Sequence, residues 1–572
     1  MTMGGDRGAT ALDAVAAVAG ELGVGKRPLR QALALLTERR QTADDLVRAC
    51  ALPRRTVDAL LRAAAGDLDA DAGGFLIGPD LAEGYRERFA LAELGLTRLS
   101  DPFQAQLAAH AGLVRQAGAD IAAAPAARAA LDHVAATAQT VVRRALWLNA
   151  TFDLAGARLL CIGDHDLSSL AACALIPGLA VTVVDVDERL LEFIGGRAAE
   201  RGHDIRCRYA DLRFGLPGDA AASADVVLTD PPYTPEGVLL FLGRGVQGLR
   251  DRRNGRLVMA YGFSPLHPAL GMKVQRAVQE LDLVAEAILP GFNRYHGAQA
   301  VGSASDLYVL RPTARTFQVL DRALAARPVQ MYTRGAQSLE GASGALDPAV
   351  AAAVTRLAAG ADDGEPSMLV GPGWPQARNG PGSSVGPAVC ELWPLFASGM
   401  PAAAGRLAVR PVRPIQVAVN LADDPGPWLL RTLLAINADH LALLVPNNQP
   451  DLAGQQAQRA LADLIAAKYA LRLRRSTPTA GYAVVEATAV PAGHQAAPVA
   501  RELMLRAHGK VGNVWREAMI RRSADGPRGP LTKGEARARI AAAVTRQDWL
   551  DARLIDLPRH AIAALLAEAE AS

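Results

Sequence analysis

An acid, two prolines and an aromatic ring stand together at Asp230-Pro231-Pro232-Tyr233, directly after the mainly apolar stretch 224–229. The prolines fix φ and donate no backbone hydrogen bond, so the chain must leave a sheet here in a stiff, extended turn. Ligands of open α/β sheets bind beyond the carboxyl ends of the strands, where this turn is expected to lie. A carboxylate and a ring in that position suit the binding of an amine. The alternative is an ordinary proline turn that closes a strand.

Three further short strands are predicted upstream, at residues 157–162, 181–184 and 205–209. Each ends at or near a glycine or an acid, and helical stretches separate them, a pattern typical of a parallel sheet with right-handed crossovers. Asp185 follows Gly163 at the spacing of an acid that binds ribose hydroxyls, and Asp211 is expected beside an adenine. Asp187 is equally well explained as a helix N-cap. The ordered set predicts a nucleoside-binding sheet of the methyltransferase type.

The first of these loops carries Asp164, His165 and Asp166. Carboxylates at this position would repel a donor that bears a carboxylate and attract one that ends in an ammonium group. An amine nucleophile must be neutral to attack carbon, and Asp166 or Asp230 is predicted to accept its proton. His165 is either a base suited to neutral pH or a residue tolerated at a loop tip.

The runs Gly163–Leu170, Asp230–Thr234 and Val301–Tyr308 resemble the bis(aminopropyl)spermidine synthase family. These are branched-chain polyamine synthases with a methyltransferase-like fold, and the resemblance covers about residues 25–312. It implies transfer of an aminopropyl group from decarboxylated S-adenosylmethionine, a co-substrate and not a permanently bound cofactor, to a polyamine nitrogen. The family's first loop usually reads Gly-Asp-Asp-Asp, whereas His165 replaces the middle acid here.

The candidate site therefore has three groups of residues. The residues predicted for catalysis are Asp166, Asp230, Tyr233 and His165. The residues predicted to bind the donor are Gly163, Asp164, Asp185 and Asp211. The residues predicted to bind the acceptor are Pro231, Pro232, Thr234, Ser303 and Ser305. No metal site is predicted, because the five cysteines show no metal-ligand spacing.

Two other functions fit parts of the sequence. The first is an amino-group methyltransferase on nucleic acid with S-adenosylmethionine as donor, since an Asp-Pro-Pro-Tyr turn also serves enzymes that methylate extruded bases. The second is a regulator whose nucleoside fold has lost turnover. The winged-helix domain and basic tail described below favour the methyltransferase, whereas the acid-rich first loop favours the aminopropyltransferase.

Composition limits the cellular setting without naming a partner. The chain has 572 residues, enough for three to four domains, and a net charge of +3 that neither demands nor excludes nucleic acid. The cysteines suit reduced thiols, the first residues lack a basic-then-apolar start, and the apolar run 171–184 is too short to span a bilayer. These features predict a cytoplasmic protein without membrane contact, and a homodimer is left open.

The predicted fold is α/β. It comprises a Rossmann-like class I methyltransferase sheet, preceded by a winged-helix domain and followed by a second, degenerate α/β half-sheet and a helical tail. The predicted divisions are a winged-helix domain (1–99), a helical connector (100–150), the catalytic domain (151–312), a linker and irregular region (313–413), the degenerate repeat (414–490) and a basic helical region (491–572).

Both ends of the chain carry features that bear on nucleic acid. Arg54 and Arg55 open the third helix of the predicted winged helix, whose second helix begins with a capping box at Thr42. Acids at 67, 69 and 71 on the predicted wing would repel phosphate, which makes DNA binding the lesser alternative. The tail beyond Val499 is basic and helical, and is interpreted as a solvated arginine surface, with a contact for nucleic acid or an acidic partner as the less common alternative.

The segment 414–490 is interpreted as a repeat of the second half of the catalytic domain. Its predicted strands and helices follow the same order, but Asn420-Leu421-Ala422-Asp423 lacks the double proline, and no nucleoside half is predicted before it. Its role is therefore predicted to be structural, and an unrelated α/β unit remains the alternative. The Gly- and Pro-rich run 377–384 is read as linker or mobile loop.

Overall fold

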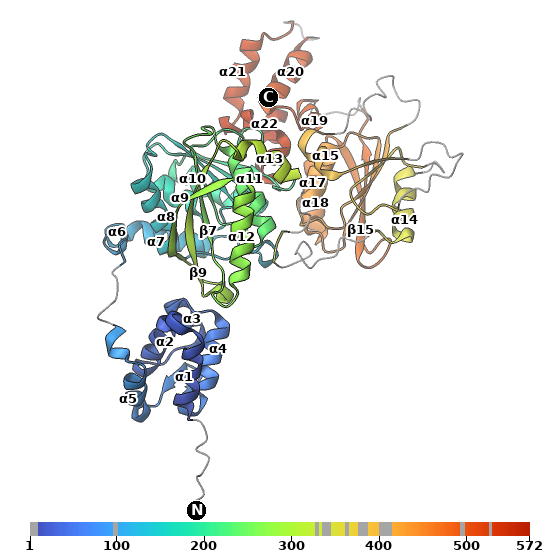
Figure 1. Ribbon diagram of the computed structural model, residues 1–572. Coiled ribbons are helices and arrows are strands. Elements are labelled where there is room, and N and C mark those ends of the chain that lie inside the picture. Colours follow the sequence, from blue (N-terminus) through green and yellow to red (C-terminus); the bar gives the residue numbers. More distant parts are fainter. Residues whose placement is uncertain are drawn as a thin grey trace, which may run out of the picture.

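The computed structural model describes residues 10–94, 101–325, 331–333, 345–360, 365–375, 387–399, 414–491, 498–524 and 529–571. An N-terminal helical unit lies below two units that are each built on a β-sheet, and the last helices project above them (Figure 1). Within the described residues, no helix combines the length and apolar character that a membrane span requires.

The N-terminal unit contains the elements that the sequence predicts. Its elements are α1 (Ala11–Glu21), α2 (Arg27–Glu38), α3 (Ala43–Cys50), α4 (Arg54–Ala63), the antiparallel pair β1 (Leu68–Asp71) and β2 (Gly74–Ile77), and α5 (Pro79–Arg88). The capping box at Thr42 is confirmed, since its hydroxyl accepts from Asp45 N and the Asp45 carboxylate accepts from Thr42 N. The winged-helix assignment stays a prediction.

The N-terminal unit contacts the loop between the last two strands of the first sheet. Arg54 Nη1 lies 3.4 Å from Gln299 Oε1. Gly302 has φ +82°, and a Cβ on it would lie 2.4 Å from the carbonyl oxygen of Ala51. Only glycine fits this close approach, so the loop that carries Ser303 is fixed against the N-terminal unit.

The first sheet has seven strands in the order β5-β4-β3-β6-β7-β9-β8, all parallel except that β9 runs antiparallel to both of its neighbours. The strands are β3 (Arg158–Ile162), β4 (Ala180–Asp185), β5 (Ile205–Tyr209), β6 (Val226–Thr229), β7 (Arg256–Tyr261), β8 (Leu283–Arg294) and β9 (Ala304–Pro312). The parallel strands β3, β4, β6 and β7 are short, mainly apolar and mostly buried, whereas the edge strand β5 carries Arg206 and Arg208. This order confirms the predicted Rossmann-like sheet of the methyltransferase type.

Helices cover both faces of the first sheet. One face packs against α8 (Ala138–Thr151), α9 (Ser168–Leu175) and α10 (Glu188–Arg201). The other face packs against α11 (Pro235–Gly248), α12 (Pro268–Glu280) and α13 (Thr316–Ala325). The connector also contains α6 (Gln104–Ala109) and α7 (Ala111–Ala123). β8 continues through Gly291 to Arg294, with irregular register against β9.

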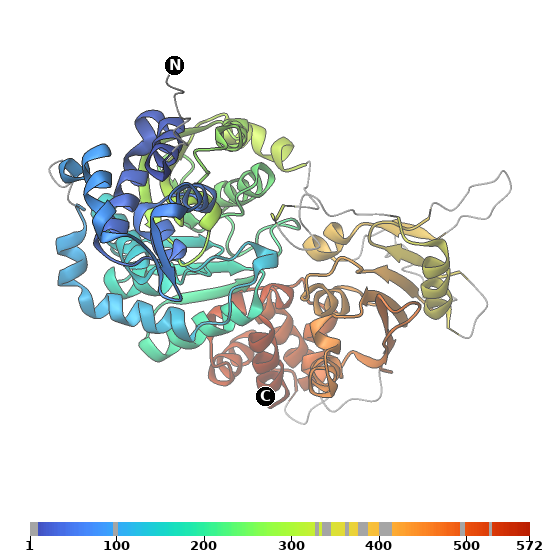
Figure 2. The same cartoon turned by 90° about the horizontal axis from the view of Figure 1, so that it is seen from below.

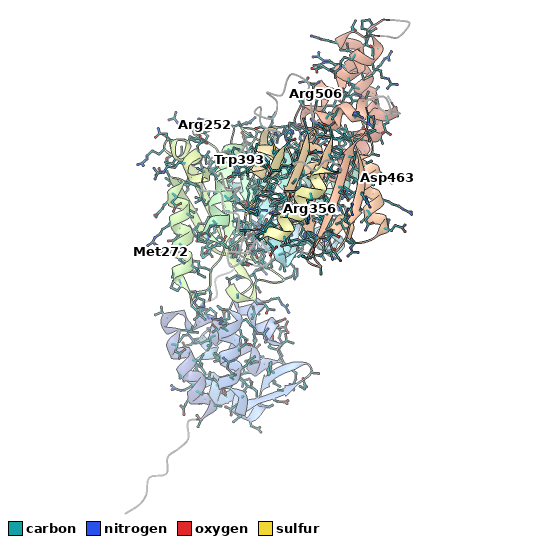
Figure 3. The ribbon with its side chains drawn as sticks, turned by 90° about the vertical axis from the view of Figure 1, so that its right-hand side faces the viewer. Arg252, Met272, Arg356, Trp393, Asp463 and Arg506 are labelled. Atoms are coloured by element: carbon teal, nitrogen blue, oxygen red, sulfur yellow. The ribbon has the colours of Figure 1, made fainter. Side chains whose placement is uncertain are left out.

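The second sheet has six strands in the order β11-β10-β12-β13-β15-β14. They are β10 (Met368–Val370), β11 (Ala388–Cys390), β12 (Gln416–Asn420), β13 (His440–Pro446), β14 (Tyr469–Arg474) and β15 (Tyr482–Ala489). One face packs against α14 (Pro348–Ala359), the other against α17 (Trp428–Ala435) and α18 (Gln455–Ile465). Figure 3 labels Arg356 on α14 and Asp463 on α18, which flank this sheet.

The prediction of a linker over 313–413 is wrong. This region holds α13, α14, β10, β11 and α15 (Leu392–Ser398), so the second sheet begins at Met368 and not at residue 414. The prediction that no first half precedes the repeat is wrong for the same reason. Strands of three residues among Gly, Pro and Ser carry too little periodicity to be recognised. The run 377–384 lies outside the described residues.

Strand order relates the two sheets. The run β10-β12-β13-β15-β14 repeats β3-β6-β7-β9-β8, and β11 pairs with β10 as β4 pairs with β3. A counterpart of β5 is not found in the part of the second unit that the structure describes. This correspondence favours an internal repeat over an unrelated α/β unit.

The C-terminal helices lie at the junction of the two sheet units (Figure 2). They are α19 (Pro498–Leu505), α20 (Val511–Ser523), α21 (Lys533–Ala543) and α22 (Arg559–Ala571). Arg208 of β5 is fully buried and binds both the side chain and the carbonyl of Asp548. Side chains of α19, α20 and α22 join the core of the second sheet. The tail is therefore helical, as predicted, and it ties the two units together.

Candidate active site

A cavity opens at the carboxyl ends of the first sheet's parallel strands and encloses about 510 Å³ of empty space, part of it open to solvent. The predicted site residues that line it are Gly163, His165, Asp185, Asp211, Asp230 and Pro232. Strand ends that are far apart in sequence therefore meet at one edge, as the topology requires.

A buried arginine lies at the centre of this site. Arg144 of α8 is 2% exposed; its Nη1 lies 2.7 Å from Asp166 Oδ2, and its Nη2 lies 2.8 Å from Asp230 Oδ2. Its Nε donates to Asn293 Oδ1 at 2.8 Å. A buried charge is tolerated only when it is paired and hydrogen-bonded, and here three neighbours supply that. Sequence reasoning placed Arg144 in the connector helix and missed this role.

Tyrosine hydroxyls surround Asp230. Tyr295 donates to Asp230 Oδ2 at 2.7 Å and lies 2.8 Å from Ser305 Oγ. The Tyr233 hydroxyl lies 3.3 Å from that of Tyr295. The structure thus brings the predicted residues Asp230, Tyr233 and Ser305 together through Tyr295, which was not among the predicted site residues. Among the described residues, none donates a hydrogen bond to Asp230 Oδ1.

The pKa values of the two carboxyl groups that share Arg144 are shifted in opposite directions. Burial opposes ionisation of Asp166, but His165 and Arg144 outweigh it and lower the pKa of this carboxyl. Burial raises the pKa of Asp230, and Arg144 holds back part of that rise. Asp166 is therefore the more firmly ionised partner, whereas Asp230 is closer to exchanging a proton.

In the first loop, the carboxylate of Asp164 binds the start of α9 and does not line the cavity. The Asp164 carboxylate accepts from Ser168 N at 2.8 Å and from Ser169 N at 3.2 Å, at the start of α9, and burial raises its pKa to about 7. Leu167 has φ +61°, a left-handed conformation that lets the chain fold back in this way. Asp164 does not line the cavity, unlike Gly163 before it.

His165 lies between the cavity and the connector. Its Nε2 lies 3.2 Å from Asp166 Oδ1 and 3.1 Å from the backbone N of Val134, and its ring stacks on His133 at 4.8 Å. Burial opposes its positive charge, but the neighbouring Asp166 and Asp230 carboxylates outweigh it and raise its pKa. The contacts restrict the ring to one orientation at the cavity wall.

The acids predicted to bind the nucleoside differ in the protein groups that donate hydrogen bonds to them. Asp185 accepts from Asp164 N and Asp187 N at 3.2 and 2.7 Å, and burial raises its pKa to about 6. Asp211 is held by Arg213, and its Oδ2 also accepts from Trp428 Nε1 of the second unit at 3.0 Å. Asp187 caps α10, which confirms the N-cap alternative.

The remaining predicted residues position the chain. The Thr234 hydroxyl accepts from Gly237 N at the start of α11 and donates to Met331 O, which holds Pro231 and Pro232 in the turn. The carbonyl of Ser303 accepts from Tyr295 N at 3.0 Å, while its buried Oγ has no hydrogen-bond partner.

Some of the basic side chains predicted to favour nucleic acid are paired within the protein. Arg54 binds Asp44 and Asp58 at 2.7 and 2.8 Å. In the tail, Arg506 pairs with Glu517 and Arg521 pairs with Glu502. Across the residues that the structure describes, no group of three His, Cys, Asp or Glu side chains is arranged to hold a metal ion.

The strand order and the position of the Asp-Pro-Pro-Tyr turn define a methyltransferase-like domain with a cavity at the carboxyl ends of its parallel strands. Residues 114–316 match the family model of the branched-chain polyamine synthase A C-terminal domain. The match of this segment to that family model confirms the resemblance found in the sequence.

Individual relatives agree over the same region. An uncharacterised protein of Methanocaldococcus jannaschii is 33% identical over 189 residues, covering 33% of this chain and 47% of the relative. The N(4)-bis(aminopropyl)spermidine synthase of Thermococcus kodakarensis is 32% identical over 170 residues, covering 29% of this chain and 47% of the relative. The chain thus spans about half the length of these curated relatives.

A solved structure also matches. The branched-chain polyamine synthase of Thermus thermophilus, in complex with N4-aminopropylspermidine and 5'-methylthioadenosine, is 23% identical. The match covers 52% of this chain and 92% of that one, with a TM-score of 0.37.

Proposed function

We propose that the first sheet transfers an aminopropyl group from decarboxylated S-adenosylmethionine to a polyamine nitrogen. The observation that carries this proposal is that a single cavity is lined by both Asp185, an acid suited to ribose, and Asp230, an acid suited to an amine. The segment that contains both matches the family model of the branched-chain polyamine synthase A C-terminal domain. The curated relatives named as bis(aminopropyl)spermidine synthases support the same reaction.

The charge of the cavity supports the proposed donor. Asp185, Asp211 and Asp230 all line it, and acids in a low-dielectric site disfavour a ligand that carries its own carboxylate. A donor that has lost that group keeps the sulfonium and a terminal ammonium, both of which these acids attract. Asp185 would hold the ribose hydroxyls, and the apolar walls Val186 and Leu212 would contact the base.

The proposed step is a direct displacement at carbon. The acceptor nitrogen attacks the aminopropyl carbon next to the sulfonium, so a C–N bond forms as the C–S bond breaks. The sulfur keeps the electron pair of that bond and leaves as the neutral thioether methylthioadenosine. The nitrogen loses one proton, which Asp230 accepts through Oδ1. Most of the rate gain is expected from holding the two reactants in line.

Binding of three ligands tests the donor. Calorimetric titration with decarboxylated S-adenosylmethionine, S-adenosylmethionine and methylthioadenosine should show that the first and third bind more tightly than the second. A clear preference for the carboxylated donor would overturn the aminopropyl proposal in favour of a methyltransferase. Absence of binding by all three would indicate a regulator that has lost its nucleoside site.

A further inference from the structure

Arg144 uses all of its nitrogens on groups of the candidate site. Besides Asp166, Asp230 and Asn293, it donates to Ser168 Oγ at 3.4 Å and to Tyr295 Oη at 3.2 Å. It does not line the cavity, whereas Asp230 does. Arg144 therefore reaches a ligand in the cavity only through its partners.

These contacts leave the two carboxylates unequal. Asp166 accepts from Ala136 N through Oδ1 at 2.9 Å and from Arg144 through Oδ2. Asp230 Oδ2 accepts from both Arg144 and Tyr295. Among the described groups, Oδ1 of Asp230 is the oxygen of this pair that accepts no hydrogen bond.

We infer that Arg144 is a positioning residue: it pins Oδ2 of Asp230 and so presents Oδ1 to the reacting nitrogen of the acceptor. Asp166 then serves to hold Arg144 and does not take the acceptor's proton. This inference rests on the proposed function, because it assigns the proton acceptor of that reaction. Of the four carboxylate oxygens of Asp166 and Asp230, Oδ1 of Asp230 is then the one that binds the acceptor amine.

Arg144 also controls when Asp230 is charged. The groups that face Asp230 are Arg144 from α8, Asp166 and His165 from the loop after β3, and Tyr295 after β8, with Tyr233 on its own turn. Removing the guanidinium leaves two buried carboxylates beside each other, which favours protonation of one of them. The pKa of Asp230 would then rise further, so Asp230 would ionise only at higher pH.

The neighbouring Arg143 provides a matched control on the same helix. It pairs with Asp101 and donates to the carbonyl of Phe292 at 3.1 Å, and it neither lines the cavity nor contacts Asp166 or Asp230. Arg143→Met and Arg144→Met each replace one guanidinium group of α8 by the same uncharged side chain. Its activity profile should match that of the native protein.

The test compares Arg144→Met, Arg144→Lys and Arg143→Met as functions of pH. Two quantities are measured: kcat/KM for spermidine with decarboxylated S-adenosylmethionine, and the affinity of spermidine for the protein saturated with methylthioadenosine. Both kcat/KM and spermidine affinity should fall at low pH as Asp230 is protonated. For Arg144→Met, we expect this fall, the acidic limb of each profile, to occur at a pH higher by about 1 to 3 units. We also expect a fall in kcat/KM of about 100-fold near neutral pH. Lysine should restore part of the shift, and methylthioadenosine affinity should stay within about twofold.

An unchanged acidic limb in a folded Arg144→Met variant would overturn the inference, because a merely structural role lowers activity without moving the limb. Should the methionine variant not fold, the lysine variant and the pair Asp166→Asn and Asp230→Asn decide instead. Asp166→Asn must retain more turnover than Asp230→Asn, and the reverse order would reject the assignment. The spermidine-binding profile needs no turnover, so it tests Arg144 even if the native protein fails to transfer an aminopropyl group.

Discussion

The two sheets share a strand order but differ in the residues and loop contacts at the carboxyl ends of their strands. In the first sheet, the register places Gly163 beside Asp230 and beside Asp185, and all three residues line a cavity that is partly open to solvent. In the second, the same register places Gly371 beside Asn420 and beside Glu391. Gly371 thus matches Gly163, whereas Asn420 stands where the first sheet has Asp230 and Glu391 stands where it has Asp185.

The second sheet closes its own strand ends. Asn420 Nδ2 donates to Pro372 O at 2.7 Å, and a Cβ on Gly371 would lie 2.4 Å from Asn420 O. The loop after β10 therefore packs on the end of β12, in the place where the first sheet keeps its cavity. The comparison teaches that strand order sets where a site can form, while the loop contacts decide whether space remains for a ligand.

The second unit instead supports the first site. Asp424 caps α17, and Trp428 at the start of that helix donates to Asp211. Arg431 of the same helix lies 4.0 Å from the ring centroid of Tyr209 and pairs with Glu188. The counterpart of the Asp-Pro-Pro-Tyr turn and the helix after it thus pack against the first unit.

The largest expected effect comes from the acid that only the first sheet retains. Asp230→Asn keeps the size of the side chain but removes its charge and its capacity to accept a proton, so turnover should fall by about 100-fold or more. Donor affinity should change by less than about twofold. Asn420→Ala, at the matching position of the second sheet, should leave both quantities unchanged. Normal turnover by Asp230→Asn would reduce the turn to an ordinary proline turn.

The next effect concerns the nucleoside. Asp185→Ala should weaken methylthioadenosine binding by roughly 1.5–3 kcal/mol, because the ribose loses a charged acceptor. Glu391 is the exposed counterpart directly after β11, and Glu391→Ala should bind methylthioadenosine as the native protein does. Calorimetry on both variants checks this, with circular dichroism as the control for folding. Equal losses in both variants would contradict a single nucleoside site in the first sheet.

A smaller effect is expected where the two units meet. Trp428→Phe keeps the ring but removes the donor to Asp211, which should cost about 1 kcal/mol of unfolding free energy. Methylthioadenosine affinity should fall by about fivefold if Asp211 needs this bond to keep its orientation. Denaturant unfolding and calorimetry measure the two quantities, and wild-type values for both would show that the second unit does not support the site.

An effect on stability and not on turnover is expected for Asp164, the acid of the first loop that turns away from the cavity. The pKa of Asp164 is raised from 3.8 to about 7 by burial, so the folded state binds this proton more tightly than the unfolded state. Unfolding free energy should therefore fall as pH rises through that interval. The matching position of the second sheet is Pro372, which cannot titrate. The Tm of Asp164→Asn relative to the native protein should rise across this interval, and a constant difference would contradict the assignment.

The first sheet was predictable because each of its parallel strands ends at or near a glycine or an acid. The second was only partly predictable, since β10 and β11 are three residues long and lack a period. Arg144 could not be assigned from sequence: its partners Asp166 and Asp230 lie 22 and 86 residues away and meet it only through the crossovers. The contact of Trp428 with Asp211 spans 217 residues and depends on how two units pack.

The central claim is that the first sheet moves an aminopropyl group and the second does not act on the donor. It is tested most directly by incubating the full chain with spermidine and either decarboxylated S-adenosylmethionine or S-adenosylmethionine, followed by mass spectrometry of the amine and the nucleoside. The account predicts an aminopropylated spermidine and methylthioadenosine from the decarboxylated donor alone, with both products lost in Asp230→Asn and retained in Asn420→Ala. A methylated product from S-adenosylmethionine, or aminopropyl transfer that survives Asp230→Asn, would contradict it.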